Sequence, residues 1–191
     1  AAQMRALGAD VINVAEVESG QMLSRCAAAL NQQNGMPSTW HAPHPAFEYF
    51  MLPGTDTFTR QQVGLLTRLS PLSPLERTSA RESYPLKSSG CGALSTNHSS
   101  GISKHYMARL RLDLPGKSGA TLAVLGLHLK AFPTSPKACH QREAQAAVAA
   151  SLLAQALDET DYVVALGDIN DFDGDECCLD AKRSRPRSWG L

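Results

Sequence analysis

The strongest constraint on the fold is a series of short apolar segments of strand length, separated by two segments of helix length. Segment 10–17 is β-branched and mostly apolar, segment 121–129 is apolar, and segment 162–166 is apolar throughout. Such runs are typical of strands buried in a sheet. Segments 47–52 and 63–68 also have strand character, and a turn-forming Pro-Gly-Thr-Asp stretch lies between them.

Two segments have helical character. Residues 21–33 are rich in Ala, Leu and Met, contain no Gly or Pro, and precede an Asn-Gly pair, while residues 140–157 carry apolar side chains at helical spacing. Segment 105–113 alternates between apolar and polar residues, and a hairpin-type turn at 115–119 joins it to the strand at 121–129. The order strand, helix, strands, helix, strand predicts a layered α/β or α+β domain.

Length and charge set limits on the organisation of the chain. With 191 residues, 43% of them hydrophobic, residues 1–191 are expected to form a single globular domain. Within it, residues 71–101 are rich in Pro, Ser and Gly and are predicted to form a long loop with a short strand near 84–87. The 18 basic residues balance the 18 acidic ones, which argues against a strongly basic nucleic-acid module or a polybasic membrane binder.

The sequence carries few signals that indicate where the protein is located. No stretch approaches the roughly 20 apolar residues that a membrane-spanning helix needs. The chain starts with Ala1-Ala2-Gln3, without an initiator Met, so we expect a processed or truncated product. Asn97-His98-Ser99 matches the acceptor for N-glycosylation, which indicates a secreted protein, although such a tripeptide also arises by chance. A secreted and an organellar location both remain open.

The cysteine spacing does not fit a zinc site. A disulfide between Cys91 and Cys139 would suit an oxidising compartment, and unpaired, partly buried thiols fit the sequence equally well. The chain contains five cysteines, which are Cys26, Cys91, Cys139, Cys177 and Cys178.

Polar residues follow several of the predicted strands at the point where each strand ends. Glu16 lies at the end of the first strand, His128 near the end of the strand at 121–129, and Asp168 and Asn170 directly after the last one. Carboxylate oxygens are the ligands that a hard divalent cation prefers, an imidazole can steady developing negative charge, and a carboxylate can orient a water molecule. These residue types are the ones that hydrolysis of a phosphate ester requires.

At this point the sequence resembles a known family. Segments 10–18, 63–71, 126–130 and 167–171 occur in the order and rough spacing of conserved blocks of the endonuclease/exonuclease/phosphatase superfamily, which has the deoxyribonuclease-I-like fold. The resemblance extends from residue 7 to about residue 180. It implies a four-layer α/β/β/α sandwich of two packed, mostly antiparallel sheets, from which this chain lacks the first and last strands.

The resemblance also implies roles for the residues at the strand ends. Glu16 is similar to the family's magnesium-ligating glutamate, so the implied cofactor is Mg²⁺, or Mn²⁺ in its place. His128 matches the histidine that contacts the scissile phosphate. Asp168 matches the residue that orients the water nucleophile, and Asn170 matches the residue that donates to the phosphate. His105 is expected to serve packing rather than catalysis.

The chain also departs from the family pattern. The family's first strand, with an Asn near the metal, and its C-terminal Asp-His pair have no counterpart here, and Ala15 stands where Gln is common. Either the chain is incomplete at both ends or the protein is a degenerate relative. Because a superfamily domain extends beyond both ends of this sequence, we expect a central portion of a longer domain.

The function implied by the resemblance is Mg²⁺-dependent phosphodiester hydrolysis, most readily as a nuclease acting on DNA or RNA. A catalytically inactive relative that serves as a subunit of a larger assembly is an alternative. A phosphodiesterase acting on phospholipids or inositol phosphates is another. The sequence does not decide between these substrates because the family shares one reaction centre and varies its loops.

Overall fold

A computed structural model describes residues 2–32, 45–114 and 117–171 of the chain. The predicted helices and strands follow one another in the predicted order, with one short N-terminal helix and one short strand in addition. The helices are α1 (Ala2–Ala6), α2 (Gly20–Asn31) and α3 (Pro136–Glu159). The strands are β1 (Val11–Val17), β2 (Glu48–Met51), β3 (Gln62–Thr67), β4 (Glu82–Tyr84), β5 (His98–Ser100), β6 (Lys104–Leu114), β7 (Lys117–His128) and β8 (Tyr162–Asp168).

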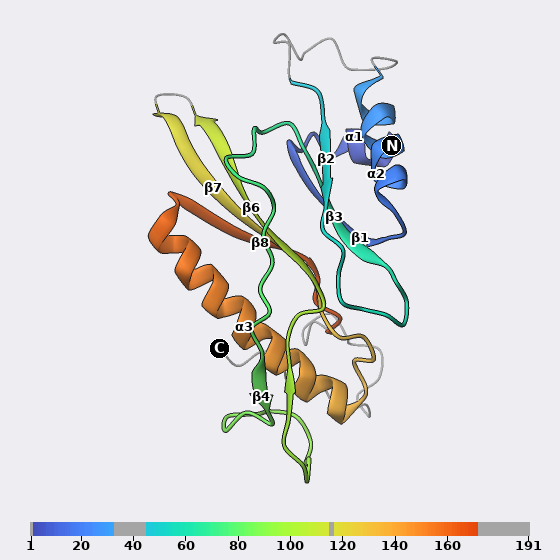
Figure 1. Ribbon diagram of the computed structural model, residues 1–191, viewed down its shortest axis with the longest axis vertical. Helices are drawn as coiled ribbons and strands as arrows, with labels where there is room; N and C mark the ends of the chain where they lie inside the picture. Colours follow the sequence, from blue (N-terminus) through green and yellow to red (C-terminus); the bar gives the residue numbers. More distant parts are fainter. Residues whose placement is uncertain (1, 33–44, 115–116, 172–191) are drawn as a thin grey trace.

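The strands form two three-stranded sheets and one small ladder (Figure 1). The first sheet has the order β1-β3-β2 and is antiparallel throughout. The second has the order β6-β7-β8, in which β6 and β7 form an antiparallel hairpin and β7 and β8 run parallel. Helix α3 makes the crossover between the parallel strands, as a parallel connection requires. The small ladder pairs β4 with β5.

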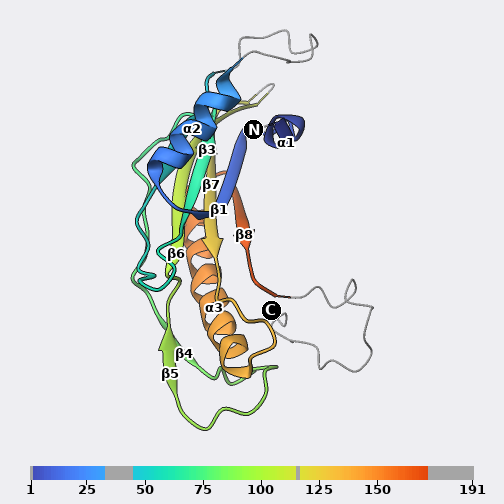
Figure 2. The same ribbon diagram turned by 90° about the vertical axis from the view of Figure 1, so that its right-hand side faces the viewer.

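The two sheets pack face to face, with α2 on the outer side of one and α3 on the outer side of the other (Figures 1 and 2). Between the sheets, Val63 and Leu65 of β3 join a buried cluster with Tyr106, Ala108 and Leu110 of β6. These side chains alternate along their strands, so successive residues face either the other sheet or a helix. The predicted four-layer α/β/β/α fold is therefore confirmed over the described residues.

Helix α2 packs closely on its sheet because of one glycine. Leu23 and Leu30 of α2 are buried against Ile12 and Leu66. A Cβ atom on Gly64 of β3 would lie only 2.3 Å from Leu23 Cδ1, so the absence of a side chain there lets the helix approach the strand.

Helix α3 begins earlier than the sequence predicts. The Ser135 hydroxyl caps the helix by accepting a hydrogen bond from the Ala138 backbone N–H at 3.3 Å, and Pro136 occupies the first turn, where its missing N–H costs nothing. The first half of α3 carries several buried polar side chains, which are His140, Arg142, Glu143 and Gln145. Their partners are loops, as described below.

Two sequence expectations about local structure were wrong. Strand β8 is not buried: Tyr162 is 42% exposed, because among the described strands β8 lies at the edge of its sheet. The short strand expected near 84–87 is instead β4, which ends at Tyr84, immediately before Pro85, and pairs with β5, which was not predicted. The turn residues 115–116 lie outside the described residues.

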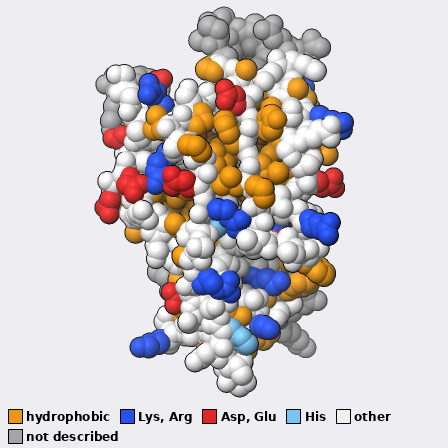
Figure 3. Space-filling model, in the orientation of Figure 1, with side chains coloured by type: hydrophobic (Ala, Val, Ile, Leu, Met, Phe, Trp, Pro, Cys, Tyr) orange, Lys and Arg blue, Asp and Glu red, His pale blue; other side chains and the backbone are white. Residues whose placement is uncertain are grey.

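A disulfide joins Cys91, in the segment between β4 and β5, to Cys139 in the first turn of α3. Of the two alternatives that the sequence left open, the structure has the bonded pair, while Cys26 is a free thiol. Among the described residues, none of the helices combines the length and the apolar character needed to cross a lipid bilayer. Acidic and basic side chains are interspersed over the face shown in Figure 3, in keeping with the formal net charge of zero.

Candidate active site

The structure brings the predicted site residues to adjacent strand ends. His128 is the last residue of β7 and Asp168 the last residue of β8, and the parallel register places them directly opposite each other. Glu16 is the penultimate residue of β1, a strand that packs against β7 and β8. Asn170 follows Asp168 by two positions. The site therefore lies where ends of the two facing sheets meet.

His128 forms the buried centre of this group. Its side chain is only 6% exposed, and its Nε2 atom lies 3.8 Å from Asp168 Oδ2. Its Nδ1 atom is buried and has no hydrogen-bond partner among the described residues. Burial lowers the pKa of His128 from its ordinary value of 6.5, and the positive charge of Lys104 lowers it further.

Three carboxylates oppose this lowering of the His128 pKa. They are Asp168, Glu16 and Asp56, each of which raises the pKa through its negative charge. Because the desolvation effect is the largest, the neutral imidazole is favoured in the folded protein. An imidazole with a neutral ground state, surrounded by charges of both signs, can serve in proton transfer or in stabilising an oxyanion.

The loop after β8 is held in place by its own side chains. The Asn170 backbone N–H donates to Asp168 Oδ1 at 2.8 Å, and the Asn170 side-chain Nδ2 donates to the Leu129 carbonyl at 3.0 Å. The Leu129 N–H in turn donates to the Asp168 carbonyl at 2.9 Å. These bonds orient the Asp168 carboxylate, whose side chain is 52% exposed and whose other oxygen faces His128.

Glu16 occupies an irregular position in β1. Its φ of 58° lies in the left-handed region, which is uncommon for a residue with a long side chain, and the register of β1 against β3 shifts between Val14 and Val17. A bulge of this kind redirects a side chain at the end of a strand. The Glu16 side chain is exposed. Backbone strain of this type costs about 1–3 kcal/mol and is characteristic of functional positions.

The donor atoms fit a hard divalent cation. Glu16 and Asp168 supply carboxylate oxygens, and among the described residues neither carboxylate forms an ion pair with a Lys or Arg side chain. Asp56 is different, because its carboxylate is bound to Lys104. Carboxylate oxygens of this kind are the donors that a hard divalent cation prefers.

Sequence reasoning missed Lys104 and Asp56. Lys104 is the first residue of β6 and pairs directly with His128 across the hairpin. Its Nζ atom lies 2.8 Å from Asp56 Oδ2 and donates to Thr59 Oγ1 at 2.9 Å, and this ammonium group holds the pKa of the Asp56 carboxyl well below its usual range. The sequence does not show which residue of β6 lies opposite His128, because the register of the two strands shifts by one residue between Leu112 and Leu114.

Three further residues of the segments that carry the resemblance, or of the strand beside them, have partners of their own away from the site. Both ring nitrogens of His105 are engaged, Nδ1 with the Ile102 carbonyl and Nε2 with the Thr78 N–H, so this buried histidine is structural as expected. Lys130 Nζ lies over the Phe132 ring. Arg68 contacts Asp10 and the Phe47 ring, at the opposite end of β1 from Glu16.

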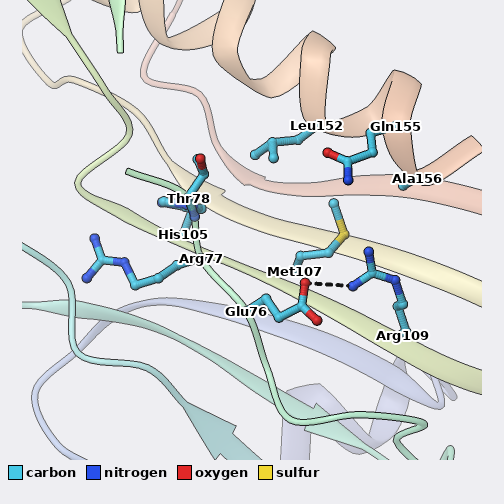
Figure 4. Close-up of a pocket in the computed structure, with 9 residues that line it drawn as sticks. All are labelled: Glu76, Arg77, Thr78, His105, Met107, Arg109, Leu152, Gln155 and Ala156. Atoms are coloured by element: carbon cyan, nitrogen blue, oxygen red, sulfur yellow. Dashed lines mark hydrogen bonds and ion pairs between the residues drawn. The ribbon is translucent and has the colours of Figure 1, made fainter. Parts of the chain in front are cut away.

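A separate pocket of about 200 Å³ lies between β6, α3 and residues 76–78 (Figure 4). Arg109 on its wall is paired with Glu76 and Glu159. The pocket contains none of the predicted site residues. Its lining is Glu76, Arg77, Thr78, His105, Met107, Arg109, Leu152, Gln155 and Ala156.

Within the described residues, one cluster has metal-ligand composition. Ligand atoms of Cys91, His140 and Glu143 lie within 4.8 Å of one another. The Cys91 sulfur is bonded to Cys139, however, so it is not the thiolate that a metal would require. The cluster joins the segment around Cys91 to the first two turns of α3 and contains none of the predicted site residues.

No protein-family model matches the chain, and no curated protein matches it. Solved structures do show similarity. They include the human Nocturnin catalytic domain with bound sulfate (13% identity, TM-score 0.49), the 2′,3′-cyclic phosphatase ANGEL2 (14%, 0.48) and truncated Caenorhabditis elegans TDP2 (12%, 0.47).

The aligned regions cover 88%, 91% and 89% of this chain, but 54%, 42% and 53% of those chains, respectively. The chain therefore spans about half the length of the solved structures that it matches. The two facing sheets with their outer helices form the four-layer arrangement that the sequence resemblance implies.

Proposed function

We propose that the protein is a divalent-metal-dependent phosphodiester hydrolase, with a nucleic acid as its substrate. The observation that carries this proposal is the juxtaposition of His128 and Asp168 in register at the ends of β7 and β8, with Glu16 close enough for its charge to act on the imidazole. A carboxylate, an imidazole and a second carboxylate are the groups needed to hydrolyse a phosphate ester.

Each residue has a distinct part in the proposed reaction. Asp168, oriented by the Asn170 N–H, accepts a hydrogen bond from the attacking water and takes its proton as the water oxygen bonds to phosphorus. The P–O bond to the leaving group breaks, and the leaving oxygen takes a proton from solvent. His128 is neutral at the start, and its N–H donor stabilises the negative charge that develops on a phosphoryl oxygen. Glu16 would hold Mg²⁺, which when bound polarises the phosphoryl group.

Asn170 has a positioning part in addition to any contact with substrate. Its carboxamide donates to the Leu129 carbonyl, so that one of its two N–H groups ties the β8 loop to the end of β7. The second N–H group is the one that could donate to a phosphate oxygen. Loss of the side chain would therefore affect both the loop and the substrate.

The test uses the full-length protein that contains this chain, assayed with Mg²⁺ on single-stranded DNA, single-stranded RNA, duplex DNA and bis(p-nitrophenyl) phosphate. We expect hydrolysis that EDTA abolishes and Mg²⁺ restores. Asp168→Asn, His128→Ala and Glu16→Gln should each lower kcat by about 10²–10⁴-fold with the fold retained. Asp10→Asn is the control, because Asp10 lies at the other end of β1 beside Arg68.

Two results would contradict the proposal. One is absence of hydrolysis of all four substrates by the wild-type protein with Mg²⁺ or Mn²⁺, which would favour a catalytically inactive subunit. The other is wild-type kcat in Asp168→Asn. The preferred substrate among the four decides between DNA and RNA.

A further inference from the structure

The largest fully buried side chain in the described structure is a charged one, Arg142 of α3, which is 1% exposed. Taking a guanidinium out of water is costly unless each of its donors finds an acceptor. Arg142 lies in the second turn of α3. The hydrogen-bond and ion-pair partners of Arg142 lie in the loops after β7 and β8.

Arg142 binds the loop that follows β7 through three backbone carbonyls. One terminal nitrogen donates to the Lys130 carbonyl at 3.1 Å and to the Phe132 carbonyl at 3.4 Å, and the other donates to the Pro133 carbonyl at 3.2 Å. Lys130 follows His128 by two residues. The planar fork of an arginine can span several acceptors in this way, which a single ammonium group cannot do.

Arg142 also reaches the loop that follows β8. Its second terminal nitrogen lies 3.8 Å from Asp171 Oδ1, and the Asp171 side chain is 3% exposed. Asp171 comes directly after Asn170 and three residues after Asp168. One buried side chain of α3 thus contacts the loops that carry both halves of the candidate active site.

Gln145, one helical turn further along α3, supports the same segment. Its Oε1 atom accepts from the Lys130 N–H at 2.9 Å, and its Nε2 atom donates to the Gly101 carbonyl at 3.2 Å. On the other side, Leu129 is bonded through its N–H to the Asp168 carbonyl and through its carbonyl to the Asn170 side chain. Residues 129 and 130 are therefore held between α3 and the β8 loop.

We propose that Arg142 is a positioning residue of the reaction centre: it holds the loops after β7 and β8 at the separation that places His128 against Asp168. The inference rests on the proposed function and extends it to a residue that touches neither substrate nor metal. A misplacement of about 1 Å in such a constellation can cost roughly 10²-fold in rate.

A neighbouring residue separates this role from general stabilisation. Glu143 is also buried in α3, but its Oε1 atom accepts from the Gly90 N–H, in the segment around the disulfide. Glu143→Ala is therefore the matched control. It removes a buried polar contact of the same helix, and that contact is to a different loop.

The experiment compares Arg142→Met, Arg142→Lys and Glu143→Ala in the full-length protein, by steady-state kinetics and by amide hydrogen exchange of Leu129 and Asn170. We expect Arg142→Met to lower kcat by about 10–100-fold with KM within about threefold. Arg142→Lys should retain an intermediate kcat, because it keeps the charge opposite Asp171 and loses the fork. Exchange at Leu129 and Asn170 should be faster in Arg142→Met and unchanged in Glu143→Ala.

Equal losses of kcat in Arg142→Met and Glu143→Ala, or wild-type kcat in a folded Arg142→Met, would overturn the inference. If the wild-type protein hydrolyses none of the substrates, the proposed function fails and the exchange rates alone decide about Arg142: faster local exchange supports the positioning role and unchanged exchange overturns it. If Arg142→Met does not fold, Asp171→Asn is measured in the same way, because it weakens the contact to the β8 loop and leaves α3 intact.

Discussion

At the scale of single residues, the state of His128 depends on a lysine from the neighbouring strand. Lys104 pairs with His128 across the β6-β7 hairpin and is itself bound to Asp56. Its positive charge disfavours a second positive charge on the imidazole and so lowers the His128 pKa. The ion pair is thus part of the electrostatic environment of the site, although neither partner was expected there from the sequence.

We predict that Lys104→Met raises the pKa of His128. The substitution removes a cation that opposes protonation, and it frees the Asp56 carboxylate, whose negative charge acts in the same direction. The measurement is an NMR titration of the His128 ring protons. Lys130→Met is the control, because the Lys130 ammonium lies over the Phe132 ring. A His128 pKa that stays the same or falls in Lys104→Met would show that the lysine does not act on this imidazole.

We predict that the buried His105 makes the free energy of unfolding depend on pH. Burial lowers its pKa below the ordinary value of 6.5, so the unfolded chain binds a proton more readily than the folded one. The free energy of unfolding should therefore be highest above pH 6.5 and should fall as the pH drops from 6.5 toward the folded-state pKa.

The measurement is denaturant unfolding at pH 7.5 and pH 5. The His105→Gln variant should be less stable at pH 7.5, since it alters the bonds to Ile102 and Thr78, and its stability should depend less on pH. If stability depends on pH in the variant as it does in the wild type, other groups are responsible. His128 is one such group, because its pKa is also lowered in the folded protein.

At the scale of elements, the β7-α3-β8 unit positions His128 and Asp168 of the candidate active site. The two strands run parallel, and the last residue of one faces the last residue of the other. Gly167, immediately before Asp168, is where this pairing is tightest: a Cβ atom there would lie 1.8 Å from the Leu127 carbonyl oxygen, and its φ is +153°. Only glycine allows the two backbones to approach so closely at the site.

We predict that Gly167→Ala lowers the free energy of unfolding by about 3 kcal/mol or more, because the methyl group meets backbone rather than a movable side chain. The Asp168 side chain should be displaced along with the strand end. Gly20→Ala is the matched control, since the nearest atoms to its added Cβ lie 4.0 Å away, and its stability should be within about 0.5 kcal/mol of wild type. Denaturant unfolding measures the stability of both variants. Equal stability of Gly167→Ala and Gly20→Ala would show that the close approach at Gly167 does not require glycine.

At the scale of the whole molecule, the disulfide connects the segment between β4 and β5 to the helix that supports the site. Cys91 and Cys139 are 48 residues apart in sequence, and the closed loop contains the whole β6-β7 hairpin. Restricting a loop of this length in the unfolded chain stabilises the fold by about 4 kcal/mol in the chain-entropy account. The buried contacts of His140 and Glu143 with residues 89–92 lie beside it.

We predict that the Cys91→Ser, Cys139→Ser double variant loses about 2–5 kcal/mol of stability and that a thiol reductant has the same effect on the wild-type protein. Thermal unfolding with and without reductant measures this, and intact mass after alkylation reports the number of free thiols. The double variant should be insensitive to reductant. An insensitive wild-type protein would show that the bond contributes little to stability.

The sequence by itself determined the order of the main elements and which of their ends carry chemistry. Alternation with period two predicted β6, and apolar or β-branched runs predicted β1, β2, β3, β7 and β8. Ala-rich and periodic apolar segments predicted α2 and α3, because such patterns follow from local backbone geometry. The polar residues that follow those runs identified Glu16, His128, Asp168 and Asn170 as candidates. Their roles remain predictions.

Only the tertiary structure decided the contacts that depend on register and on packing between distant segments. An extra residue in β7, opposite the β6 segment between Leu112 and Leu114, shifts the pairing by one residue and places Lys104 opposite His128. The edge position of β8 among the described strands leaves it half-exposed despite its apolar sequence. Arg142 and Gln145 read as ordinary polar helix residues until the loops after β7 and β8 fold onto them. Local patterns record the conformation of one segment, whereas burial of a charge depends on which segments meet, and that is settled only when the chain is packed.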